Sequence, residues 1–92
     1  MEKEYVVGLD IGSSRVTIAV GLRGKDSVSI LGVETKDVGA NVKDGDILNY
    51  IEVGKAIESA KRSLEQELGL RIESAYVGVS GKSVYSVRYE DY

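Results

Sequence analysis

Short apolar runs separated by turn residues predict three strands in the first part of the chain. Residues 5–9 are nearly all apolar over the length of a strand, as expected for a central strand that is covered on both faces. Residues 16–22 and 28–34 are rich in β-branched side chains and flank the turn-like segment Arg23-Gly24-Lys25-Asp26. The three runs therefore predict an antiparallel meander.

The middle of the chain predicts a loop followed by one long helix. Residues 36–48 hold two glycines and an acidic pair and indicate a loop. Asn49 is the expected N-cap, with Glu52 reaching back to it as in a capping box, and Gly69 is the expected residue after the helix end. Apolar residues recur between them at steps of three and four and predict a buried stripe: Val53, Ile57, Ala60, Leu64 and Leu68.

The opposite face of this helix is charged. It carries Glu58, Lys61, Arg62 and Glu65 at spacings that permit weak ion pairs. Such a face is usually solvated, so we expect these four side chains to point into water.

The last part of the chain predicts a fourth strand and a further one. Residues 75–79 form the fourth, and a right-handed crossover through the helix would place it beside the first strand. Residues 83–89 would follow after the turn at Ser80-Gly81-Lys82, with Tyr85, Val87 and Tyr89 on one face. The expected fold class is α/β, with a mixed sheet in the order 3-2-1-4 and one crossover helix.

The candidate chemistry lies in residues 9–15, Leu-Asp-Ile-Gly-Ser-Ser-Arg, between the first two predicted strands. A buried strand that ends in a carboxylate, turns through Gly-Ser-Ser and returns as a second strand can hold a metal-bound triphosphate. The alternative is a tight β-hairpin with a polar tip and no ligand, for which these residue types are also suitable.

Composition narrows the possible functions. The 92 residues suffice for one small domain, and a formal net charge of -3 argues against non-specific binding of nucleic acid. The chain has no Cys and no His, which excludes disulfides, zinc sites and Ser-His-Asp or Cys-His catalysis. No apolar run approaches the ~20 residues of a membrane span, and residues 1–4 lack the apolar core of a signal peptide. A cytoplasmic location is therefore expected.

The order of elements and the 9–15 motif resemble the actin-like ATPases, the superfamily that includes heat-shock chaperone ATPases and sugar kinases. Within it the chain is most similar to the FtsA family of bacterial cell-division proteins, through residues 7–16, 39–46 and 72–81. The Ser-Gly turn after the fourth strand favours FtsA, while a type IV pilus assembly ATPase stays an alternative. The resemblance implies a ribonuclease H-like, actin-like ATPase half domain.

The resemblance also implies a site for ATP and Mg²⁺. Asp10 would position the magnesium ion, largely through water, rather than act as a base. Gly12 would let the backbone approach the phosphates, the N–H groups from Gly12 to Ser14 would point at them, and the hydroxyls of Ser13 and Ser14 would add donors. Arg15 stands where related proteins often carry Lys or Arg, but strand alternation can equally direct it into solvent. No residue of this chain is expected to be catalytic.

The family further implies partners and a location. Its members tether the ring of FtsZ, a tubulin-like protein, to the inner face of the cell membrane at the division site, and they assemble into filaments. The membrane contact is a C-terminal helix that this sequence does not include. We expect an N-terminal part of such a protein, in which residues 1–82 form the first subdomain and residues 83–92 begin an inserted one.

Two consequences are expected for the chain alone. It should neither hydrolyse ATP nor bind it more tightly than about millimolar, because half a site makes few contacts. Its unpaired strand edges predict self-association.

Other functions have weaker support. Ribonuclease H-like nucleases share the strand order but cluster several carboxylates around two metals, and the fourth strand here ends in Val79-Ser80-Gly81 without an acid. Asp44-Gly45-Asp46 lacks the later ligands of a calcium loop. A base-stacking role for Tyr76, Tyr85, Tyr89 and Tyr92 lacks a basic groove, so these rings are expected to cover a sheet face or an interface. A non-catalytic module that binds a partner by strand addition is compatible with the family resemblance.

Overall fold

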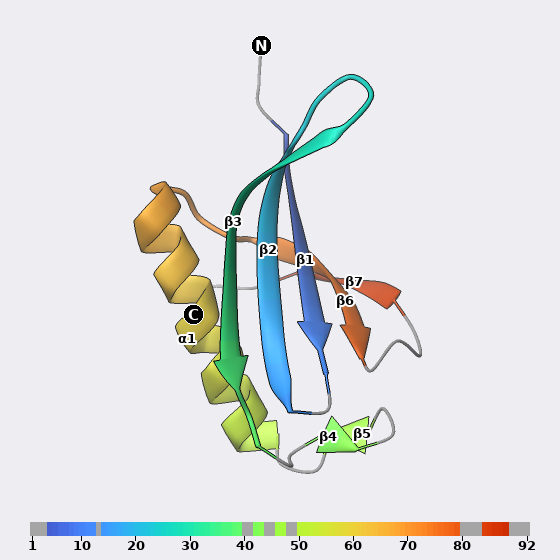
Figure 1. The fold of residues 1–92 in the computed structure, drawn as a ribbon, viewed down its shortest axis with the longest axis vertical. Coiled ribbons are helices and arrows are strands. Elements are labelled where there is room, and N and C mark those ends of the chain that lie inside the picture. The colour runs from blue at the N-terminus through green and yellow to red at the C-terminus, as the bar shows by residue number, and fades with distance from the viewer. Residues whose placement is uncertain are drawn as a thin grey trace.

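The computed structural model describes residues 4–12, 14–39, 42–43, 46–47, 50–79 and 84–88. One sheet and one long helix make up most of it (Figure 1). The five strands of the sheet are β1 (Tyr5–Ile11), β2 (Arg15–Arg23), β3 (Val28–Asp37), β6 (Ser74–Val79) and β7 (Val84–Arg88). The helix is α1 (Tyr50–Leu68), and β4 (Val42–Lys43) pairs with β5 (Asp46–Ile47) in a separate short hairpin.

The sheet is mixed, with the strand order β3-β2-β1-β6-β7. β1 pairs antiparallel with β2, which pairs antiparallel with β3, whereas β1 and β6 are parallel. The predicted order 3-2-1-4 is therefore confirmed. The further strand predicted over residues 83–89 is also present as β7, which pairs antiparallel with β6 at the sheet edge.

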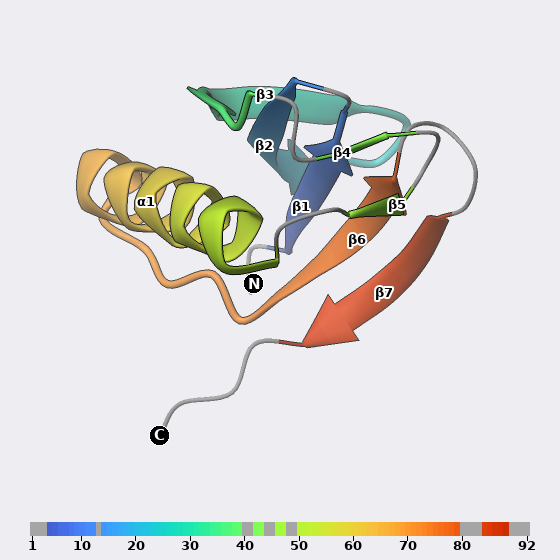
Figure 2. The ribbon, with the colours of Figure 1, turned by 90° about the horizontal axis from the view of Figure 1, so that it is seen from below.

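The core lies between α1 and one face of the sheet (Figure 2). Side chains of β1 and β2 alternate, and every second one from Val7 to Ile11 and from Val16 to Val20 faces the helix and is buried. The helix contributes part of its predicted apolar stripe, of which Val53, Ala60 and Leu64 are buried. The buried residues of the two central strands are Val7, Leu9, Ile11, Val16, Ile18 and Val20.

The opposite face of the sheet is open, which corrects the expectation that the first strand is covered on both faces. On β1 this face carries Val6 and Gly8, which are half-buried, and Asp10, which is exposed. No described element packs over them (Figure 2). The apolar sequence of β1 predicted that other elements pack on both of its faces. Within the described part of the chain, only α1 packs on it, and on one face.

The third strand is longer than predicted. It ends at Asp37 rather than residue 34, because its pairing with β2 continues as far as Arg15. Its last four residues, Glu34 to Asp37, are polar. They fit here because β3 is an edge strand and every second side chain in this part is exposed. The predicted loop 36–48 also contains β4 and β5, each only two residues long. This hairpin lies at the same end of the sheet as the β1–β2 turn (Figures 1 and 2).

The end of α1 agrees with its predicted cap. Gly69 has a positive φ of 64°, a conformation that favours glycine. Its N–H and that of Leu70 both donate to the carbonyl of Glu65, at 2.9 and 3.2 Å. The predicted N-cap, Asn49, lies outside the described residues. Among the described helical residues, none form a helix long and apolar enough to span a bilayer.

Two of the four charged residues on α1 are not solvated as predicted. The side chains of Lys61 and Glu65 are only 15% and 20% exposed, and the Nζ of Lys61 lies 3.7 Å from Oε1 of Glu65. The backbone N–H of Ile72 donates to Oε2 of Glu65 at 2.8 Å. The chain that leaves the helix therefore runs back along this side of it, a contact that helical periodicity alone does not predict.

Candidate functional site

Asp10 lies one residue before the end of β1, on the open face of the sheet. Its neighbours in the sequence, Leu9 and Ile11, are buried beneath α1, so alternation directs Asp10 away from the helix. Across the sheet it pairs with Thr17 on β2 and with Gly78 on β6. β1 and β6 are parallel and end together, the kind of sheet edge where α/β proteins bind ligands (Figure 1).

The predicted β-hairpin after Asp10 is present and tightly closed. Ile11 pairs with Val16, and the N–H of Gly12 donates to the carbonyl of Arg15 at 2.9 Å. The N–H of Val38, just after β3, donates to the carbonyl of Ser14 at 2.8 Å. The turn is thus held by one hydrogen bond within it and by a second from the residue that follows β3.

These bonds change the predicted role of Gly12. Its N–H was expected to point at a phosphate, but it already donates within the turn. A Cβ on Gly12 would lie 3.2 Å from the Arg15 carbonyl oxygen, closer than most real Cβ contacts. Glycine at this position therefore serves the closure of the turn. Ser13 lies outside the described residues, and Ser14 is exposed at the tip.

Arg15 is exposed at the start of β2. Because Val16 is buried under α1, alternation puts Arg15 on the open face, the same face as Asp10 and Thr17. Its partner in the sheet register is Asp37 at the end of β3. Arg15 therefore lies exposed on the face of the sheet that carries Asp10.

Sequence reasoning missed the hydroxyl groups next to Asp10. Thr17 and Thr35 are register partners on β2 and β3, and their Oγ1 atoms lie 3.2 Å apart in a hydrogen bond. A shallow hollow beside them is lined by Gly8, Leu9, Asp10, Thr17, Ala19, Tyr76 and Gly78. Only the pairing register of β1 and β2 reveals that Thr17 lies beside Asp10, because Thr17 pairs with Asp10 and shares a face with Arg15.

The side-chain oxygen atoms near Asp10 suit a hydrated magnesium ion better than a metal ion enclosed by several carboxylates. Within the described ranges, no three His, Cys, Asp or Glu side chains gather into a metal cluster. Mg²⁺ is commonly held by one or two carboxylates while it keeps several waters and binds phosphate oxygens. The single exposed Asp10 carboxylate with hydroxyls beside it fits that type of coordination.

Comparison with known proteins gives the family. No protein-family model matches the chain. Cell division protein FtsA of Pseudomonas aeruginosa is 32% identical over 85 residues, which cover 91% of this chain and 20% of that protein. FtsA of Streptococcus pneumoniae is 34% identical over 77 residues, which cover 84% of this chain and 17% of that protein. FtsA of Bacillus subtilis is 33% identical over 81 residues, which cover 88% of this chain and 18% of that protein. The chain belongs to the FtsA family. It spans about a fifth of the length of these curated relatives.

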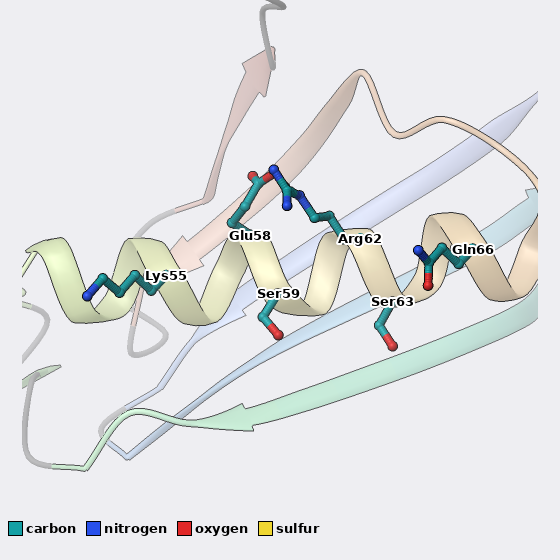
Figure 3. A pocket seen from close by; sticks show the side chains of 6 residues that line it. All are labelled: Lys55, Glu58, Ser59, Arg62, Ser63 and Gln66. Atoms are coloured by element: carbon teal, nitrogen blue, oxygen red, sulfur yellow. The ribbon is translucent and has the colours of Figure 1, made fainter.

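A second hollow of this FtsA-family chain lies on the outer surface of α1 (Figure 3). All of its lining residues come from the one helix: Lys55, Glu58, Ser59, Arg62, Ser63 and Gln66. The Nε of Arg62 donates to Oε1 of Glu58 at 3.0 Å, and the Arg62 side chain is 73% exposed. For Glu58 and Arg62 the structure agrees with the solvated face that the sequence predicted.

Other predicted features of the FtsA-family chain are only partly described. Tyr76 is 53% exposed on the open face, and no described element covers it. Residues 44–45 of the rejected calcium loop and the turn at 80–82 lie outside the described residues, as do Tyr89 and Tyr92. The backbone of Tyr85 lies in β7.

Proposed function

We propose that this chain supplies the first phosphate-binding hairpin of an FtsA-like ATP-binding protein that acts in bacterial cell division. The observation that carries the proposal is the exposed carboxylate of Asp10, which follows the buried residues Val7 and Leu9 of β1 and precedes a tight turn in a chain similar to FtsA. The proposed fold is the ribonuclease H-like half domain of an actin-like ATPase, in line with the sheet order and the single helix.

Asp10 would orient a hydrated Mg²⁺ ion. A carboxylate and a triphosphate repel each other, so both can share the site only if a divalent cation lies between them. The cation, when bound, would neutralise phosphate charge. Arg15, exposed on the same face, would add a positive charge at the outer end of the site.

The turn would present the remaining groups to the phosphates. Ser13 and Ser14 are proposed to donate hydroxyl hydrogen bonds, and the small size of Gly12 lets the backbone come close. The N–H of Gly12 is not part of this set, because it donates to Arg15.

The wider assembly is part of the same proposal. Residues 1–82 would be the first actin-like subdomain and residues 83–92 the start of the next, which would make this chain one wall of a two-lobed ATP cleft. Such a protein would attach the FtsZ ring to the inner face of the cell membrane at the division site and would form filaments. The chain alone is expected to bind ATP no more tightly than about millimolar and not to hydrolyse it.

The cell-division role can be tested by exchanging the matched segment into Pseudomonas aeruginosa FtsA. The chimaera is expected to support division when the resident FtsA is depleted, and the same chimaera with Asp10→Asn is expected to give filamentous cells. Asp26→Asn is the matched control, because Asp26 is an exposed acid in the β2–β3 turn and outside the site. Normal division with Asp10→Asn, at equal protein level, would argue against a role of the site in division.

A further inference from the structure

Three side chains with oxygen ligands form a row across the open face of the sheet. Asp10 on β1 pairs in register with Thr17 on β2, and Thr17 pairs with Thr35 on β3. Residues in register across neighbouring strands direct their side chains to the same face, with Cβ atoms about 5 Å apart. A carboxylate and two hydroxyls therefore follow one another at the end of the sheet where β1 meets its turn.

The hydroxyl next to Asp10 is held by the hydroxyl beyond it. Oγ1 of Thr17 and Oγ1 of Thr35 lie 3.2 Å apart, and either atom can be the donor. When Thr17 donates to Thr35, the lone pairs of Thr17 are free to accept a hydrogen bond on the side that faces Asp10. Thr17 is half-buried, whereas Thr35 is exposed, so Thr35 lies at the outer end of the row.

The face beside this row has space for a ligand. The shallow hollow that Asp10 and Thr17 line has Gly8 and Gly78 next to them on β1 and β6. A Cβ built on Gly8 would meet no atom within 4 Å, so the space above this strand is open. The hollow therefore leaves room for the water shell of a cation held by the two polar side chains that line it toward the turn, Asp10 and Thr17.

We propose that Thr17 is a positioning residue for a divalent cation at Asp10, accepting a hydrogen bond from a water molecule bound to that cation. Thr35 orients the Thr17 hydroxyl by accepting a hydrogen bond from it. The inference rests on the proposed function, and it extends the site from the turn onto the second and third strands. It also accounts for how a single carboxylate orients a cation that keeps most of its water.

The inference is tested by measuring ATP binding to the 92-residue chain by amide NMR, with Mg²⁺ and with EDTA. Thr17→Val removes the hydroxyl and keeps the shape of the side chain. It is expected to weaken binding of Mg-ATP about three- to tenfold, the effect of one lost hydrogen bond, whereas ATP in EDTA is expected to bind neither the variant nor the wild type. Thr17→Ser restores the hydroxyl and is expected to bind like the wild type. Thr35→Val is expected to have a smaller effect than Thr17→Val.

Mn²⁺ in place of Mg²⁺ separates failure of this inference from failure of the proposed function. In the wild type, Mn-ATP is expected to broaden the amide signals around Asp10 and Thr17. If that broadening is present and Thr17→Val still binds Mg-ATP like the wild type, Thr17 has no such role and the ATP site stands. If Thr17→Val binds Mg-ATP more weakly but its free amide spectrum also changes throughout the sheet, the loss follows from an altered fold, Thr17 has a purely structural role, and the inference is also overturned. If Mn-ATP broadens no signal in the wild type, the ATP site fails and the inference fails with it.

Discussion

Gly32 of β3 lies directly against Leu64 of α1. A Cβ built on Gly32 would lie 3.0 Å from Cδ2 of Leu64 and 3.3 Å from Cδ1 of Leu68. Two large side chains of the helix thus occupy the space that a side chain on the edge strand would need. The absence of a side chain at one position sets how closely the helix approaches β3.

Replacing Gly32 by Val is expected to destabilise the fold. The branched side chain would push Leu64 and Leu68 away from the sheet, at a cost of about 1–3 kcal/mol in the free energy of unfolding. Urea denaturation followed by circular dichroism measures this change. Gly54→Ala is the control, because a Cβ on Gly54 in α1 meets nothing within 4 Å and should stabilise the helix by about 0.5–1 kcal/mol. Equal effects of the two substitutions would contradict the close packing.

Removing the Glu65 side chain is expected to loosen the connection between α1 and β6. In Glu65→Ala the N–H of Ile72, a residue only 3% exposed, loses its acceptor, at a cost of about 1–3 kcal/mol. Glu65→Gln keeps an acceptor oxygen and should cost less, since it weakens only the ion pair with Lys61. Thermal unfolding and hydrogen exchange at the Ile72 amide report both effects. Glu67→Ala, an exposed position on the same helix, should change stability by no more than about 0.5 kcal/mol.

Gly69 should tolerate asparagine better than alanine. Its φ of 64° is a left-handed conformation that costs most side chains about 1–2 kcal/mol but is accessible to Asn. The expected order of unfolding free energies is therefore wild type, Gly69→Asn, Gly69→Ala, from most to least stable. If Gly69→Ala matched the wild type, the positive φ would not be a requirement of the helix end.

The sequence predicted the features that depend on local periodicity. The strand order followed from apolar runs and from a helix long enough to connect parallel strands, and the end of α1 followed from Gly69. The hairpin after Asp10 followed from small and polar residues between two β-branched runs. The residues that mark each element are close together in sequence, and the rule for right-handed crossovers was enough to place β6 beside the distant β1.

The features that it did not predict depend on contacts between distant segments. Thr17 and Thr35 are 18 residues apart, and only the sheet register brings their hydroxyls together beside Asp10. Glu65 differs from Glu58 because it accepts a hydrogen bond from Ile72, in the segment that returns past the helix end. The periodicity of the helix gives no information about that segment. β4 and β5 are too short for an apolar alternation to mark them as strands.

Binding of Mg-ATP at the Asp10 turn is the central claim, and an amide NMR titration of the 92-residue chain with Mg-ATP, repeated on Asp10→Asn, tests it most directly. Asp10 is exposed, so the substitution should leave the fold and the free spectrum largely unchanged. The account predicts saturable shifts centred on residues 8–15, with an affinity of about millimolar, that disappear in Asp10→Asn. A well-dispersed spectrum that does not respond to Mg-ATP, or the same shifts in both proteins, would contradict it.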